Sequence, residues 1–226
     1  MRKLFLLLLL CPLLLQAQDR KAAKAEERRQ AREVVDVIRE GGIVIRLTTN
    51  ARKIERMQEL LDNGSLTSLN RQRLEARIKT TIEETQAEQE MMVELMRQEY
   101  DLGPVYFIHD TTLVLLKSGA LSGYFLNDDL EVDPEITRPE DFLIGQVGYT
   151  DAATTARAEA LMLTDREQLP LPAPFPNAIT FNNLGYAFNK TLAPDMADRR
   201  RLEGMIQRLR SKLASAMNDL LESEGE

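Results

Sequence analysis

The chain's only histidine stands beside an aspartate, at the end of the segment VYFIHD (105–110). A histidine oriented by a carboxylate is the pairing that general-base catalysis uses. The β-branched and aromatic residues before it predict a strand, and neighbouring side chains of a strand point to opposite faces. His109 then shares a face with Val105 and Phe107, away from Asp110. We interpret His109 as a strand-end residue that packs and makes one hydrogen bond.

The acidic segment NDDLEVDPE (127–135) raises the question of a calcium site. Carboxylates follow the spacing of an EF-hand loop at Asp129, Glu131, Asp133, Glu135 and Glu140. Pro134 occupies the position at which that loop needs a glycine for its sharp turn. We therefore interpret the segment as a solvated acidic loop, and we expect neither a metal nor a cofactor.

Polar residues at the predicted strand ends form a candidate binding site. Ligands of open α/β sheets bind outside the carboxyl ends of the strands. The residues that this rule selects are Asp110, Thr111, Asp128 and Tyr149. The sequence contains no G-x-S-x-G, H-E-x-x-H or glycine-rich phosphate loop, which argues against an enzyme of those classes.

Residues 1–17 have the pattern of a secretory signal peptide. Arg2 and Lys3 precede a leucine-rich run over 4–15, and Ala17 supplies a small residue for cleavage. The run is shorter than the roughly 20 apolar residues of a spanning helix. A leucine precedes Cys11 where a lipoprotein has Gly or Ala, which disfavours lipid attachment. We expect export to the periplasm or the medium, with no transmembrane segment after cleavage.

Cleavage would leave a chain without cysteine, because Cys11 is the only one. That excludes disulfides, thiol redox chemistry and zinc–thiolate sites in the mature protein. The net charge of −7 argues against binding to nucleic acid, which favours basic proteins. The predicted organisation is a signal peptide (1–17), a polar helical segment (18–40) and one α/β domain (41–222).

A long helix over 66–101 is the most prominent predicted element. Its apolar stripe is formed by Leu74, Ile78, Ile82, Met92, Met96 and Tyr100. Thr85 and Gln89 interrupt this stripe as a polar gap. Asn50 is the predicted N-cap of the helix that precedes it.

A mixed sheet of about five or six strands, flanked by helices, is the predicted architecture, with an α+β arrangement as the alternative. The expected strands lie at 43–49, 105–110, 123–127, 142–150, 159–165 and 178–181. The segment 111–119 fits a short helix or another strand. The proline-alternating run LPLPAPFP (169–176) fits a docking ligand or a stiff crossover that packs Leu171 and Phe175, and we favour the crossover.

A C-terminal amphipathic helix begins near Pro194. Its basic residues are Arg199, Arg200, Arg201, Arg208, Arg210 and Lys212. Such a face can lie on anionic lipid or hold a phosphate. We favour a solvated face balanced by the acidic tail Glu222, Glu224 and Glu226.

The motifs GPVYFIHD, GYFLNDDLEVDP and LPAPFP, in this order between a long helix and a basic helix, resemble a family of exported, functionally uncharacterised α/β proteins of Gram-negative bacteria. The resemblance covers residues 41–215 and implies export and an α/β fold, without an activity. The strand–helix alternation also allows a distant thioredoxin-like arrangement, which without cysteine could not perform that fold's chemistry.

Two hypotheses of function follow. The first is a non-catalytic cell-envelope protein that acts through an interface on the long helix, at Met91, Met92, Leu95 and Met96, since methionine adapts to varied partners. The alternative for these four residues is packing on the sheet, and we favour it. The second hypothesis is a small-molecule-binding protein or hydrolase with its site near Asp110.

Export gives the first testable prediction. N-terminal sequencing of the protein recovered from the periplasm or the medium is expected to begin at Gln18. An intact Met1, or a lipid on Cys11, would contradict it.

Overall fold

The computed structural model describes residues 22–64, 66–150, 158–181, 186 and 194–222. The predicted signal peptide lies outside these residues. Among them, no helix is both long enough and apolar enough to cross a membrane.

Six strands form one mixed sheet in the order β3-β2-β1-β4-β5-β6. They are β1 (Ile43–Leu47), β2 (Val105–His109), β3 (Phe125–Leu126), β4 (Leu143–Tyr149), β5 (Glu159–Thr164) and β6 (Ala178–Thr180). β1 runs parallel to β2 and β4, and the remaining neighbours are antiparallel. The predicted α/β architecture with five or six strands is confirmed.

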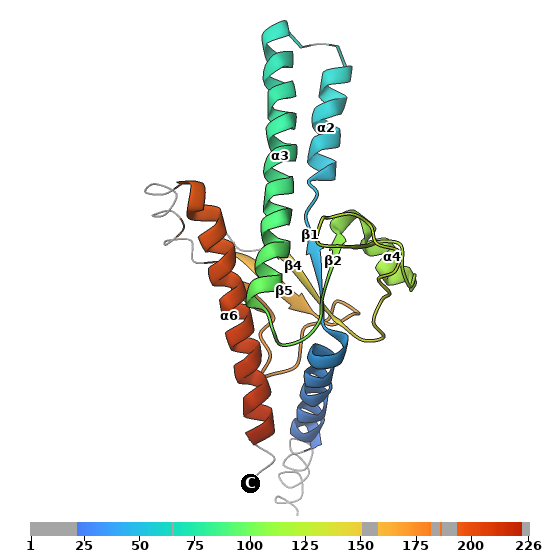
Figure 1. Cartoon of the computed structure of the whole chain (residues 1–226), viewed down its shortest axis with the longest axis vertical. Helices are drawn as coiled ribbons and strands as arrows, with labels where there is room; N and C mark the ends of the chain where they lie inside the picture. Colours follow the sequence, from blue (N-terminus) through green and yellow to red (C-terminus); the bar gives the residue numbers. More distant parts are fainter. Residues whose placement is uncertain (1–21, 65, 151–157, 182–185, 187–193, 223–226) are drawn as a thin grey trace, which may run out of the picture.

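The N-terminal helix spans residues 22–36 and continues as the π-turn η1 (Val37–Gly41). The other helical elements are α2 (Ala51–Asp62), α3 (Ser68–Glu99), η2 (Asp110–Thr112), α4 (Leu113–Ser118) and α6 (Pro194–Glu222). The ambiguous segment 111–119 is therefore helical. The long helix and the C-terminal helix are both confirmed. Figure 1 shows that α2 and α3 form a hairpin that extends from the sheet along the longest axis of the molecule.

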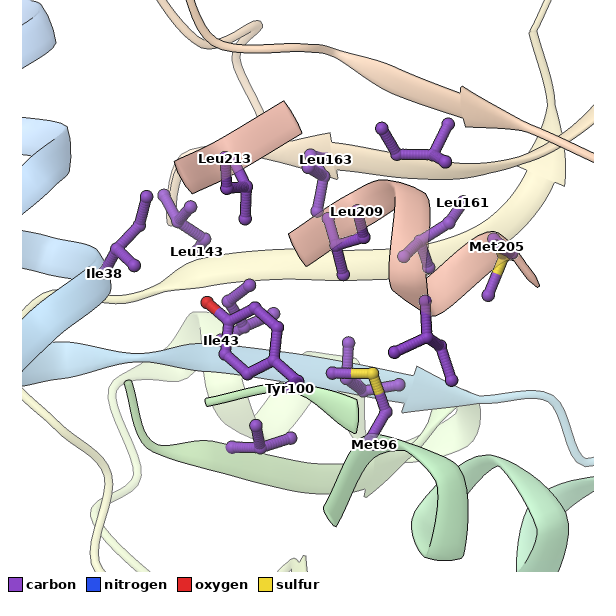
Figure 2. Packing of buried hydrophobic residues seen from close by; sticks show 14 of the residues in the cluster. Ile38, Ile43, Met96, Tyr100, Leu143, Leu161, Leu163, Met205, Leu209 and Leu213 are labelled. Atoms are coloured by element: carbon purple, nitrogen blue, oxygen red, sulfur yellow. The ribbon is translucent and has the colours of Figure 1, made fainter. Parts of the chain in front are cut away.

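The larger core lies on one face of the sheet, under α3, α6 and the N-terminal helix. Side chains of β1, β4 and β5 meet Met96 of α3 and Leu209 of α6 there, and Ile38 closes one end (Figure 2). Leu171 and Phe175 of the proline-alternating run belong to this core, so the expectation that they pack is confirmed.

A smaller core covers the opposite face. Val44, Ile108 and Ile144 of three neighbouring strands contact Leu116 of α4 and the buried ring of Phe125. β1 is consequently buried on both of its faces, as expected for the central strand of a parallel group.

The four residues of the proposed interface on the long helix do not form an exposed surface. Met92, Leu95 and Met96 are buried, and Met91 is partly buried against the same core. The expectation that this set contacts a partner is therefore corrected: α3 turns these side chains onto the sheet and α6. Ile82, which was expected in the buried stripe, is 44% exposed because it lies on the projecting part of α3.

Three arginines of the basic face of α6 form ion pairs with other elements of the fold. Arg199 pairs with Glu94 of α3 at 2.8 Å, and Arg210 pairs with Asp101 at 2.6 Å. Arg201 reaches Glu159 of β5 at 2.6 Å. Glu224 and Glu226 of the acidic tail lie outside the described residues, so the balance expected from that tail stays a prediction.

Core packing gives the second prediction. Met96→Ala is expected to lower the free energy of unfolding by about 2–5 kcal/mol, since it leaves a cavity at a solvent-free position. Ile82→Ala, on the projecting part of the same helix, is the control and should cost less than about 1 kcal/mol. Urea denaturation followed by circular dichroism measures both, and equal losses would contradict the burial described above.

Candidate functional site

A cleft of about 700 Å³ opens at the carboxyl ends of β1 and β2. Parallel pairing brings these ends to one edge of the sheet, with Leu47 opposite His109. The chain leaves β2 and returns as β4 on the other side of β1, so the connections change direction here. Ligands of open α/β sheets bind at such a switch point. The cleft is lined by Arg46, Thr48, Thr49, Asn50, Ala51, Arg52, Lys53, Asp110, Thr111 and Val114.

The turn between β1 and α2 lines the cleft and is hydrogen-bonded to Asp110, the residue that follows β2. The Thr49 hydroxyl donates to Asp110 Oδ1 at 2.6 Å, and the Thr49 backbone N–H donates to the same oxygen at 3.2 Å. The helical segment that follows β2 has no side-chain cap among the described residues, and the Asp110 carboxylate holds the β1–α2 turn instead. This carboxylate fixes the position at which α2 begins.

The same turn is also hydrogen-bonded to α3. Asn50 Nδ2 donates to Thr85 Oγ1 at 2.8 Å, and Gln89 Nε2 donates to the Thr48 carbonyl at 2.7 Å. Thr85 and Gln89 are the polar gap that interrupts the apolar stripe of α3. These two polar residues therefore have a structural role, because their hydrogen bonds hold the turn that lines the cleft.

Three cations surround the cleft. Arg46 leaves β1 half-buried, and its Nη1 donates to Gln146 Oε1 of β4. Arg46 Nε is buried and has no hydrogen-bond partner among the described residues. Burial lowers the pKa of the guanidinium, and the Asp110 carboxylate opposes that shift. Because arginine stays protonated in proteins, Arg46 is a partly desolvated cation with an unused donor.

The other two cations, Arg52 and Lys53, are exposed in the first turn of α2. Positive side chains are unfavourable there, since the helix dipole places partial positive charge at this end. No acidic residue occurs in the turn, and the Asn50 side chain is engaged by Thr85 rather than capping α2. An anion in the cleft would relieve this repulsion.

The structure brings together two of the four predicted binding residues. Asp110 and Thr111 line the cleft. Asp128 lies elsewhere, paired with Arg97 of α3 at 2.9 Å. Tyr149, at the end of β4, is 62% exposed and is not part of the cleft lining.

Several cleft residues escaped the sequence analysis: Arg46, Thr49, Asn50, Arg52 and Lys53. Two signals could have pointed to them. Arg46 is a charged residue inside an otherwise apolar strand, and the polar gap in α3 required a polar partner.

The arrangement supports binding rather than covalent chemistry. The Thr49 hydroxyl contacts a carboxylate, as an activated nucleophile would. That carboxylate oxygen also accepts the Thr49 backbone N–H, and Thr49 Oγ1 accepts the Ala51 N–H at 3.3 Å, so the pair serves the turn. The described residues contain no group of three or more His, Cys, Asp or Glu side chains placed to hold a metal ion.

His109 pairs with Leu47 in the register of β1 and β2, and the two side chains lie on the same face of the sheet. Val105 and Phe107 share this face, as the alternation of side chains along a strand requires. The His109 ring is half-buried and makes no hydrogen bond with another described residue, so the expected single bond is not found. Burial lowers the pKa of His109 below its ordinary value of 6.5, and the Asp110 carboxylate opposes that shift.

The lowered pKa gives a prediction of pH dependence. Because the pKa of His109 is lower in the folded state, the unfolded state binds more protons below about pH 6.5. The free energy of unfolding therefore falls as the pH drops through about 6.5. His109→Gln is expected to remove this dependence between pH 7 and the range in which carboxylates titrate, since the chain has no other histidine. Urea denaturation across this pH range tests it. An equal slope in the wild type and the variant would contradict it.

No family model, curated protein or solved structure matches this chain. The resemblance named from its motifs stays a prediction. The proposals below accordingly depend on the contacts and charges of the chain itself.

Proposed function

We propose that this protein binds a small anionic molecule, through a carboxylate or phosphate group, in the cleft at the carboxyl ends of β1 and β2. The proposal is for a binding protein without catalytic activity. It includes export to the periplasm or the medium, as the N-terminal pattern predicts.

Arg46 is the observation that carries the proposal. The guanidinium of Arg46 is half-buried, and its Nε has no hydrogen-bond acceptor within the described part of the chain. Leaving such a group unpaired costs free energy, which an acceptor on a bound ligand would offset. Hydrogen bonds from arginine to carboxylate or phosphate are among the strongest in proteins. The cleft offers the place from which such a group can reach Arg46.

The surroundings of Arg46 support the same ligand class. Arg52 and Lys53 add two positive charges to a cleft in which Asp110 is the only carboxylate among the lining residues. Hydrogen bonds that Asp110 and Thr85 accept and Gln89 donates hold the turn in place without a ligand, which lowers the entropy cost of binding. The volume of about 700 Å³ lies within the range of small-molecule sites.

A second candidate function is an envelope protein that acts through an interface. The α2–α3 hairpin supports it, because it extends from the sheet and exposes apolar residues at Leu60, Leu69 and Ile82 (Figure 1). The contact would involve this projecting part of α3 rather than the buried methionines.

Binding is tested by isothermal titration calorimetry with phosphate, pyrophosphate, citrate and a nucleoside monophosphate. At least one of these anions is expected to bind the wild type. Arg52→Gln with Lys53→Gln should weaken that binding at least about tenfold, since charge-assisted hydrogen bonds contribute about 1.5–3 kcal/mol each. Arg46→Gln should weaken it by a similar factor.

The matched control is Arg28→Gln with Lys212→Gln, which removes the same charge from exposed helix positions outside the cleft. It should change the affinity by less than about threefold, as expected for a long-range charge effect screened by salt. Binding of none of these anions to the wild type would refute the proposal. An equal loss in the control and the cleft variants would show that the anion binds elsewhere.

A further inference from the structure

The two ends of the molecule differ in the charged side chains that they expose. The α2–α3 hairpin extends at one end of the longest axis, and the N-terminal helix extends at the other (Figure 1). The hairpin end has a cationic face on α3, although the α2 side of this end carries Glu59 and Asp62 and the whole chain has a net charge of −7. The opposite end concentrates carboxylates around a groove.

The distal part of the hairpin, here called the arm tip (residues 59–64 and 66–79), presents cations with exposed apolar residues. The α3 portion of the tip carries Arg71, Arg73, Arg77 and Lys79 against a single Glu75. Arg73 and Arg77 are exposed and have no ion pair with a described residue. Leu60 is 53% exposed and Leu69 is 54% exposed.

The opposite end contains a groove of about 920 Å³, formed by residues 30–41, 139–143 and 165–172. Seven carboxylates and a single guanidinium line it, together with apolar side chains that include Val37 and Phe142. Leu169 at this groove is 59% exposed. The groove therefore combines carboxylates with apolar side chains.

The groove does not neutralise its own charge. Its guanidinium, Arg166, is engaged by Asp141 at 2.5 Å and Glu167 at 2.7 Å. Asp36 and Glu40 have no cationic partner among the described residues, and Glu140 interacts only with the already engaged Arg166. The arm tip of the same molecule cannot supply one, because it lies at the far end of the long axis (Figure 1).

We propose that the arm tip of one copy docks in the acidic groove of a second copy. The exposed Arg73 and Arg77 would pair with the unpartnered carboxylates, and Leu69 would contact the apolar floor near Leu169. Complementary charge of this kind sets the register and the partner choice of an interface. Because the two contacting surfaces differ, the contact is head-to-tail, and repetition produces rings or filaments rather than a closed two-fold dimer.

Sedimentation velocity over a concentration series tests the proposal with two variants. The tip variant is Arg73→Glu with Arg77→Glu, and the groove variant is Asp36→Asn with Glu40→Gln and Glu140→Gln. The wild type is expected to self-associate at low salt and to dissociate as ionic strength rises. Each variant alone should associate at least tenfold more weakly than the wild type.

Mixing the two variants is the decisive measurement. The groove variant retains a normal tip, and the tip variant retains a normal groove, so one productive contact remains. A head-to-tail contact therefore predicts a one-to-one complex that grows no further. A contact between two arms predicts no such complex and would overturn the proposal.

The matched control is Asp129→Asn with Glu131→Gln and Glu135→Gln, which removes the same charge from the acidic loop outside the groove. It should associate as the wild type does. A wild type that stays monomeric at low salt, or a groove variant that associates as the wild type does, would overturn the proposal. Unchanged thermal unfolding of each variant verifies its fold, and the salt dependence of the wild type remains a test if a variant fails to fold.

Discussion

The parallel pairing of β1 with both β2 and β4 is the constraint on which the rest of the structure depends. Ile43, Val44 and Ile45 are almost free of solvent, so both faces of this strand must be covered. The amino end of the sheet is crowded as a result. A Cβ added to Gly41 would lie 1.8 Å from the Asp141 carbonyl oxygen, and one added to Gly103 would lie 1.8 Å from the Ile38 carbonyl oxygen. The carboxyl end is open by comparison, because the chain must leave it through a turn, and the cleft lies at that turn.

α3 has two parts that behave differently because of what covers them. The part near its C-terminus packs on the sheet and exchanges ion pairs with α6, as between Glu94 and Arg199. The part near its N-terminus contacts α2 and projects beyond the sheet (Figure 1). Thr85 lies between the two parts and holds the β1–α2 turn through Asn50. A single helix thus completes the core, positions the cleft and supports the projecting arm.

Charge is distributed unevenly over the fold, which the overall value of −7 conceals. Cations gather at the carboxyl edge of the sheet and on the α3 side of the arm tip, and carboxylates gather at the groove at the amino edge. The two proposed binding sites differ in the sign of the charge that lines them. The cleft would take a small anion, and the groove would take the arm of a second copy. The two proposals involve different residues, so either can fail without the other.

Local sequence patterns were sufficient to predict the order and type of the elements, since hydrophobic periodicity and turn residues are local signals. They identified the six strands, the long helix and Asp110, and they located the N-terminus of α2 at Asn50. Only the tertiary structure decided which polar residues meet. Thr49 and Asp110 are 61 positions apart, and Arg199 and Glu94 are 105 apart. Contacts over such separations depend on strand order and on how helices cross the sheet, and no local pattern encodes either. For the same reason packing of the α3 methionines on the sheet was expected from the sequence, but the additional cover by α6 was not.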